Sequence, residues 1–132
     1  MSIIAQNLFY QMQVERERNL IIIEAKGCWN SPEEIPFYLL HLKESLSLVQ
    51  PGFSVLFDLR QLEEFSHAVR FYRVEAQKLM LSAGICQLVE VHDLSKTMSL
   101  LSMAIAEETG IPLNIFDCLQ DARAWLSELR QR

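Results

Sequence analysis

The sequence is poor in glycine and proline, with four of each in 132 residues. It contains neither G-x-G-x-x-G nor G-x-x-x-x-G-K-[ST], the glycine patterns that let backbone N–H groups approach a phosphate closely. The sequence therefore lacks the standard dinucleotide and phosphate loops. The low glycine and proline content also excludes a collagen-like or linker-rich chain.

Basic residues are outnumbered, with 12 Lys and Arg against 17 Asp and Glu and a net charge of −5. This balance argues against nucleic-acid binding, because a nucleic-acid binder needs a basic surface to attract phosphates. No apolar stretch approaches the ~20 residues that span a bilayer, and the N-terminus lacks the basic and apolar regions of a signal peptide. We therefore expect a soluble, cytoplasmic protein that is not transmembrane.

Cysteine is also scarce, because Cys28, Cys86 and Cys118 are the only three. They are odd in number and far apart, and none forms a C-x-x-C pair. The three histidines lack the short spacings of a zinc site. We expect three free thiols that pack as small apolar groups in a reducing compartment, with no bound metal and no cofactor.

Apolar residues make up 50% of the sequence, enough to build a core. The length predicts one domain over residues 1–132, because domains typically contain about 100–200 residues. Alternation along 8–15, followed by a β-branched run at 20–25, predicts an antiparallel hairpin. Further strands are predicted at 53–58, 85–91 and 113–116, and helices at about 35–49, 68–83, 95–109 and 119–129.

The order of these elements is β-β-α-β-α-β-α-β-α. Strands that alternate with helices favour right-handed crossovers, so the sequence predicts a single α/β domain with a mixed, mostly parallel sheet and an antiparallel N-terminal hairpin. The first helix shows a conflict: Ser31 and Glu34 form a capping-box pattern, yet Pro36 disturbs a helix that starts there. We expect a distorted start, or a helix that begins near Ile35.

Polar residues follow the predicted central strand at 53–58, where α/β sheets collect ligands. Ser66 and His67 stand at the start of the next helix. We predict a partner-binding patch made of Asp58, Arg60, Ser66, His67, Arg70 and Arg73. The plainer alternative, favoured because such caps occur at most helix starts, is that Ser66 caps the helix, Asp58 holds the loop and the arginines are solvated.

The sequence gives little support for catalysis. Ser66 and His67 are neighbours, which seldom point at each other, and no carboxylate can be assigned to orient the histidine. An enzyme that uses Asp58, Ser66 and His67 is thus the weakest hypothesis, and we expect a protein without catalytic activity. Four apolar residues make a soft helical surface for which core packing is favoured over ligand binding: Met98, Leu100, Leu101 and Met103.

Several stretches resemble a known family. These are the strand that ends at Gly27, the Asp58-Leu59-Arg60 strand end and the terminal Ala122-x-x-Trp125-Leu126. Over residues 9–129 the sequence resembles the SpoIIAA-like branch of the STAS superfamily. The resemblance implies a small α/β domain with four or five strands that serves as a non-enzymatic regulatory or interaction module.

The resemblance also bears on a phosphorylation switch. In anti-sigma-factor-antagonist members, a serine at the start of the helix after the Asp-Leu strand end is phosphorylated, which breaks partner binding. That position falls on Ala68 here, and the glycine after it falls on Val69. The usual phosphorylatable serine is therefore missing, and Ser66 would be a shifted acceptor. More divergent members of the fold bind apolar ligands between sheet and helices.

Taken together, the sequence predicts a non-catalytic module that binds a protein partner through residues 60–67 and the helix at 68–83. The alternative is binding of an apolar small molecule or lipid in a pocket between sheet and helices. A homodimer through the first strand, at the sheet edge, is left open.

Overall fold

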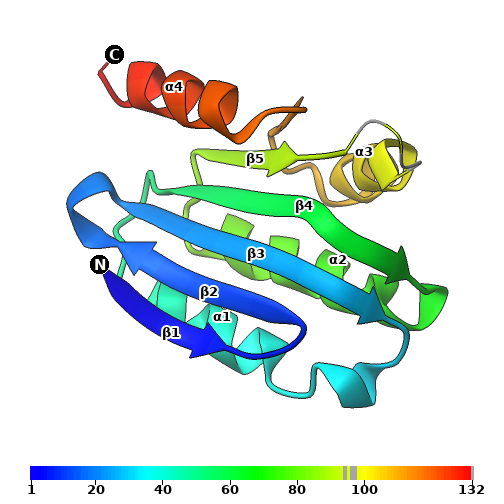
Figure 1. Ribbon diagram of the computed structural model, residues 1–132. Helices are drawn as coiled ribbons and strands as arrows, with labels where there is room; N and C mark the ends of the chain where they lie inside the picture. Colours follow the sequence, from blue (N-terminus) through cyan, green and yellow to red (C-terminus); the bar gives the residue numbers. More distant parts are fainter. Residues whose placement is uncertain (94, 96–97, 132) are drawn as a thin grey trace.

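The structure is a computed structural model that describes residues 1–93, 95 and 98–131 (Figure 1). Two 3₁₀ turns, at Arg16–Arg18 and Pro32–Glu34, accompany the main elements. The strands and helices are β1 (Ser2–Gln6), β2 (Tyr10–Glu15), β3 (Leu20–Trp29), α1 (Tyr38–Leu46), β4 (Ser54–Phe65), α2 (His67–Ser82), β5 (Gln87–Val91), α3 (Met98–Thr109), β6 (Leu113–Phe116) and α4 (Leu119–Arg130).

The six strands form one sheet in the order β1-β2-β3-β4-β5-β6. β2 is antiparallel to both of its neighbours, β1 and β3, whereas β3 to β6 pair in parallel. Asn19 closes the β2–β3 turn with a φ of 53°, a left-handed conformation that asparagine tolerates. Its side chain exchanges hydrogen bonds with the backbone of Gln50 at 2.8 and 3.0 Å, which ties the hairpin to the loop before β4.

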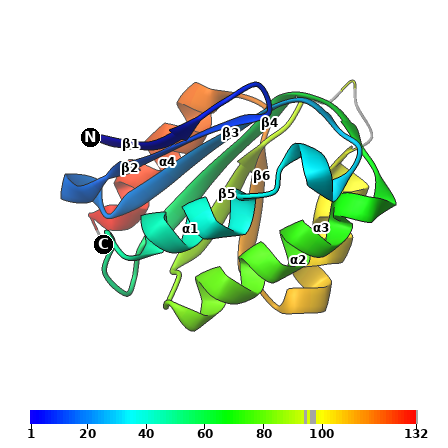
Figure 2. The same ribbon diagram turned by 90° about the horizontal axis from the view of Figure 1, so that it is seen from below.

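Helices cover the two faces of the sheet unequally (Figures 1 and 2). α1, α2 and α3 pack on one face through Leu42, Val69 and Ala106. α4 lies on the other face, where Ala122 and Leu126 pack against apolar side chains of β3, β4 and β5. Because successive strand residues point to opposite faces, β3 and β4 are apolar on both sides.

An aromatic cluster fixes α1 against the sheet. The Trp29 ring is fully buried and stands edge-on to those of Tyr38 and Tyr10, with ring centroids 5.1 and 6.2 Å away. The Trp29 indole donates a 2.9 Å hydrogen bond to the carbonyl of Phe9, so its polar atom is satisfied. Trp29 is therefore a core anchor, whereas Trp125 is half-buried beside Phe116.

The predicted α/β fold, with its antiparallel hairpin and parallel strands, is confirmed. The distorted start of the first helix is also confirmed, because a 3₁₀ turn at Pro32–Glu34 precedes α1. The Glu34 carboxylate accepts hydrogen bonds from the backbone N–H groups of Asn30 and Ser31. Positions 96 and 97 of the helix predicted from 95 lie outside the described residues.

Three expectations about the strands and cysteines are wrong. β1 is an additional strand, and β4 continues to Phe65 through the segment predicted as a loop. This continuation is stabilised by pairing with the extended second half of β3. The cysteines are free, but Cys86 is exposed and the other two are half-buried instead of packed inside. Within the described residues, no helix is long and apolar enough to cross a membrane.

Candidate functional site

A cleft of about 400 Å³ lies where β4 passes into α2. β4 is the longest strand, with 12 residues, and it carries Phe65 beyond the shorter β5 to the carboxyl edge of the parallel strands. Ligands of open α/β sheets collect at this edge. The cleft is lined by Glu63, Phe65, Ser66, His67, Arg70, Met98 and Leu101.

Ser66 joins β4 to α2 and is held by the end of β3. Its hydroxyl donates a 2.6 Å hydrogen bond to the carbonyl of Asn30, and its N–H donates to the carbonyl of Trp29 at 3.1 Å. Ser66 occupies the N-cap position of α2, but its side chain makes no capping hydrogen bond there. The expected cap is therefore wrong, and the first N–H groups of α2 present a partial positive charge beside the cleft.

His67 and Arg70 stand one turn apart on α2 and both line the cleft. His67 is exposed. The Arg70 guanidinium donates to the Glu108 carboxylate of α3 at 3.0 Å, and both side chains are partly exposed, at 33% and 48%. A pair this open to solvent is weak, so Arg70 remains accessible to an incoming acidic group.

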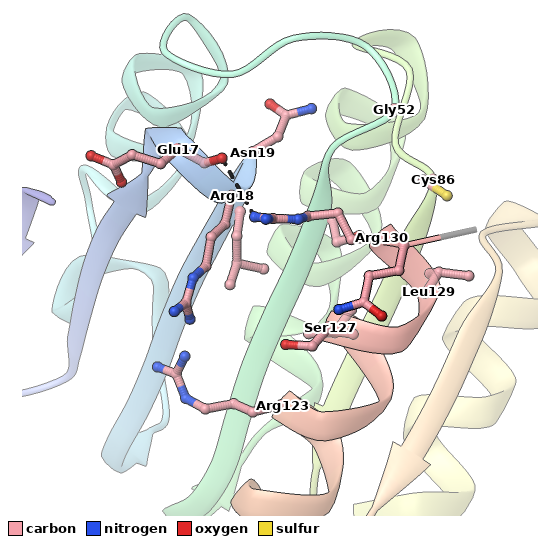
Figure 3. Close-up of a pocket in the computed structure, with 13 residues that line it drawn as sticks. Glu17, Arg18, Asn19, Gly52, Cys86, Arg123, Ser127, Leu129 and Arg130 are labelled. Carbon is pink, nitrogen blue, oxygen red and sulfur yellow. Dashed lines mark hydrogen bonds between the residues drawn. The ribbon is translucent and has the colours of Figure 1, made fainter.

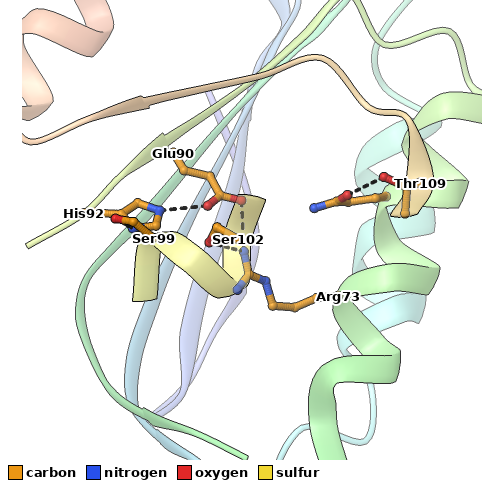
Figure 4. A network of polar contacts seen from close by, with 7 residues as sticks. Arg73, Glu90, His92, Ser99, Ser102 and Thr109 are labelled. Carbon is orange, nitrogen blue, oxygen red and sulfur yellow. Dashed lines mark hydrogen bonds and ion pairs between the residues drawn. The ribbon is translucent and has the colours of Figure 1, made fainter. Parts of the chain in front are cut away.

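Arg73 is 2% exposed, so its predicted place in a surface patch is wrong. Its Nη2 donates to the carboxylate of Glu90 at 3.0 Å and to the hydroxyl of Ser102 at 2.9 Å (Figure 4). The guanidinium lies over the rings of Phe65 and Phe57, 5.2 and 5.7 Å from their centroids. Phe65 therefore separates the buried Arg73 from the cleft and supports the cleft wall.

Glu90 is the centre of this buried network. His92 Nε2 lies 2.8 Å from its second oxygen, and Ser99 Oγ lies 3.1 Å from His92 Nδ1. Burial by itself raises the pKa of the Glu90 carboxyl, but the charge of Arg73 and hydrogen bonds from His92 and Ser102 outweigh burial and leave the pKa below its ordinary value. The network ties α2, β5 and α3 together beneath the cleft.

Asp58 and Arg60 lie away from the cleft. Asp58 follows Phe57 on β4 and points to the opposite face, toward α4, where Leu56 also packs. Its carboxylate accepts three hydrogen bonds from Arg60, at 3.1 Å from the backbone N–H, 3.0 Å from Nε and 2.8 Å from Nη2. The expectation that Asp58 and Arg60 share one patch with Ser66, His67 and Arg70 is therefore wrong.

The cleft is also lined by apolar residues of α3, which the patch predicted from the sequence did not include. Met98 packs against the core and Leu101 is half-buried, and both line the cleft. Leu100 and Met103, expected inside, are 75% and 54% exposed. Glu90 was not singled out from the sequence. An acidic residue inside the apolar strand at 85–91 was the available signal, because a buried carboxylate requires a partner.

Metal binding finds no support in the part of the chain that the structure describes. No three His, Cys, Asp or Glu side chains among these residues gather in a way that could hold a metal ion. Glu90 and His92 do lie in contact, but the remaining neighbours of the carboxylate are Arg73 and Ser102. A guanidinium in this position takes the place that a cation would need.

Comparison with known proteins gives a structural likeness. The sequence matches no protein-family model and no curated protein. The structure is similar to the crystal structure of an uncharacterised protein from the DUF3478 family, with a SpoIIAA-like fold, from Shewanella loihica PV-4. The TM-score is 0.63 over 92% of this chain and 98% of that chain, at 16% sequence identity. The fold is SpoIIAA-like. At this identity the likeness concerns the fold, and function must be argued from the cleft.

Proposed function

We propose that this SpoIIAA-like protein is a non-catalytic regulatory module that binds a protein partner at the cleft between the start of α2 and the start of α3. The observation that carries the proposal is the cleft itself, where the N-terminus of α2, His67 and Arg70 adjoin Phe65, Met98 and Leu101. The loop and helix predicted from the sequence to bind a partner both contribute to it.

The position of Ser66 supports a binding role over a catalytic one. A serine nucleophile needs its hydroxyl hydrogen-bonded to a base, yet the Ser66 hydroxyl donates to the carbonyl of Asn30. Asp58, which the catalytic hypothesis combined with Ser66 and His67, is paired with Arg60 on the opposite face of the sheet. These contacts support recognition as the role of the cleft.

The lining of the cleft defines the chemistry of the partner segment. The α2 N-terminus, His67 and Arg70 favour an acidic side chain, and Phe65, Met98 and Leu101 favour an adjacent apolar one. We therefore propose a partner that presents an acidic residue beside an apolar residue. Glu63 at the rim adds a negative charge that would repel an acidic group placed at the wrong end of the cleft.

Binding of an apolar small molecule is the second candidate. It is favoured by the three apolar lining residues and by the volume, which falls within the range of small-molecule pockets. Native mass spectrometry of freshly purified protein separates the two candidates, because a retained ligand adds a discrete mass. Replacement of Leu101 by Glu would remove that mass if the ligand lies in this cleft.

The partner proposal is tested by capture from the native cell lysate followed by titration of the purified partner. Reversal of charge in Arg70→Glu should weaken binding at least about tenfold, because a charged contact contributes roughly 1.5–3 kcal/mol. Arg16→Glu is the matched control, since Arg16 is exposed and does not line the cleft. Wild-type affinity in both Arg70→Glu and Leu101→Glu would contradict the proposal.

A further inference from the structure

A second cleft, of about 410 Å³, lies at the opposite edge of the sheet, where β3, β4 and β5 begin (Figure 3). The turn between β2 and β3 forms one wall, and the C-terminal half of α4 forms another. It shares no residue with the cleft at α2. Nothing in the proposed function uses it.

Three arginines line this cleft: Arg18 from the turn, and Arg123 and Arg130 from α4. Their convergence is a local excess of positive charge on a protein whose net charge is −5. Figure 3 shows the guanidinium groups of Arg18 and Arg123 directed toward each other, while Arg130 points at the turn from the other side of the cleft.

The contacts that hold these arginines are long. Arg18 and Arg123 approach the same carboxylate, that of Glu15, at 3.6 and 3.9 Å. Within the described residues, Arg130 donates to the backbone carbonyl of Glu17 at 3.4 Å, and the Glu17 carboxylate is directed away from it. Hydrogen bonds between guanidinium and carboxylate are typically 2.7–2.9 Å long, so these contacts leave most N–H donors of the three groups available as far as the described residues go.

Two leucines in an otherwise largely polar lining are suited to the carbon portion of a ligand. Leu20 of β3 and Leu126 of α4 border the cleft beside the arginines. Small-molecule sites combine an apolar wall with a few convergent polar groups and enclose about 300–1,000 Å³, and this cleft falls within that range. Guanidinium groups fit phosphate and carboxylate groups through paired N–H donors, so the set favours an oxyanion ligand.

We propose that this cleft binds a small organic anion with two or more oxyanion groups. One oxyanion group bridges Arg18 and Arg123, and another binds Arg130 across the cleft. The carbon portion of the ligand packs against Leu20 and Leu126. Glu15, at 3.6 Å from Arg18 and 3.9 Å from Arg123, offsets part of their positive charge, and the bound anion neutralises the remainder.

Cys86 provides a direct probe of occupancy, because it is exposed and lines this cleft. Pyrophosphate and citrate, compared at constant ionic strength, represent phosphate and carboxylate ligands. We expect at least one of them to slow alkylation of Cys86, measured by peptide mass spectrometry, and to raise the Tm of the protein. Protection by pyrophosphate alone assigns a phosphate ligand, and protection by citrate alone assigns a carboxylate ligand.

Arginine substitutions inside and outside the cleft distinguish a specific binding site from non-specific attraction of anions to positive charge. Arg123→Gln and Arg130→Gln should each weaken binding about tenfold or more, whereas Arg16→Gln, on the same turn as Arg18 but outside the cleft, should bind as the wild type does. The proposal is overturned if neither anion protects Cys86 more than sodium chloride of matched ionic strength. It is also overturned if Arg16→Gln and Arg123→Gln lose affinity equally.

Discussion

Each face of the sheet holds an arginine–carboxylate pair, one between α2 and β5 and the other within β4, in different surroundings. Arg73 and Glu90 meet beneath α2 and α3, with side chains 1% and 0% exposed. Arg60 and Asp58 meet on the face that α4 covers, with the Arg60 side chain 39% exposed. The N–O distances are similar, at 3.0 and 2.8 Å, so geometry alone does not distinguish the pairs.

The comparison shows that burial decides what each pair contributes. Water reaches the Arg60 guanidinium and screens its pair with Asp58, although the Asp58 side chain is only 11% exposed, so loss of Arg60 has a smaller cost than loss of Arg73. Neither Arg73 nor Glu90 can reach water, and a charge left without its partner there is strongly unfavourable. The buried pair also positions Phe65 in the cleft wall, because the Arg73 guanidinium lies over its ring.

The largest effect is expected from Arg73→Met. This substitution leaves the Glu90 carboxylate buried without its cation, and we expect the free energy of unfolding to fall by about 3–5 kcal/mol. Urea denaturation monitored by the fluorescence of Trp29 and Trp125 measures it. The double substitution Arg73→Met with Glu90→Leu should recover part of the loss, because apolar replacements of a buried pair are often neutral. A loss below about 1 kcal/mol for Arg73→Met would show that the buried pair contributes no more to stability than the partly exposed Arg60–Asp58 pair.

An intermediate effect is expected on the pH dependence of stability. The pKa of Glu90 is lower in the folded state than its ordinary value of 4.5, so the unfolded chain binds more protons as the solution becomes acidic. The stabilisation is complete above the unfolded pKa and is lost as the pH falls through the folded pKa. Urea denaturation at a series of pH values should therefore show a shallower acid decline for Glu90→Gln than for the wild type.

Glu107→Gln is the control for this experiment, because Glu107 is an exposed carboxylate on α3. It should show the same acid decline as the wild type. An unchanged slope in Glu90→Gln would indicate that the carboxylate has the same proton affinity in the folded and unfolded chains, which contradicts the contact with Arg73.

The smallest effects are expected from the partly exposed pairs. Arg60→Gln should lower the free energy of unfolding by about 1 kcal/mol or less, and Arg70→Gln by about 0.5 kcal/mol or less. Both losses should shrink further in high salt, because screening weakens exposed pairs. Urea denaturation at low and high salt measures them. A loss above about 2 kcal/mol for Arg60→Gln would place that pair energetically with the buried one.

Part of the candidate site was predictable from the sequence. Ser66, His67 and Arg70 follow a strand that was correctly placed in the interior of the sheet, and all three line the cleft. Asp58 was misplaced because period-two alternation along β4 directs it to the face opposite Phe57. A loop at 59–66 would have let the chain bring Asp58 and Ser66 together. The strand instead continues to Phe65, so Asp58 stays within the sheet.

Arg73 shows why helical periodicity was insufficient. Arg73 stands three residues after Arg70 on the predicted helix, and both interpretations of the sequence placed the two arginines at the surface. In the structure α3 packs along that side of α2, so Arg73 meets Ser102, and Gln77 accepts a 2.7 Å hydrogen bond from Thr109. Periodicity records which side of a helix faces the sheet, but it does not record that a second helix covers its flank.

The sequence by itself determined the type of most elements, because the 2.0 and 3.6 residue periods of apolar side chains record which side of each element is buried. It also indicated the place of the cleft, at the end of an interior strand. Only the tertiary structure decided the addition of β1, the extension of β4 along β3 and the burial of Arg73 against Glu90. Each of these depends on a contact between segments distant in the chain, and the local pattern of residues carries no record of such a contact.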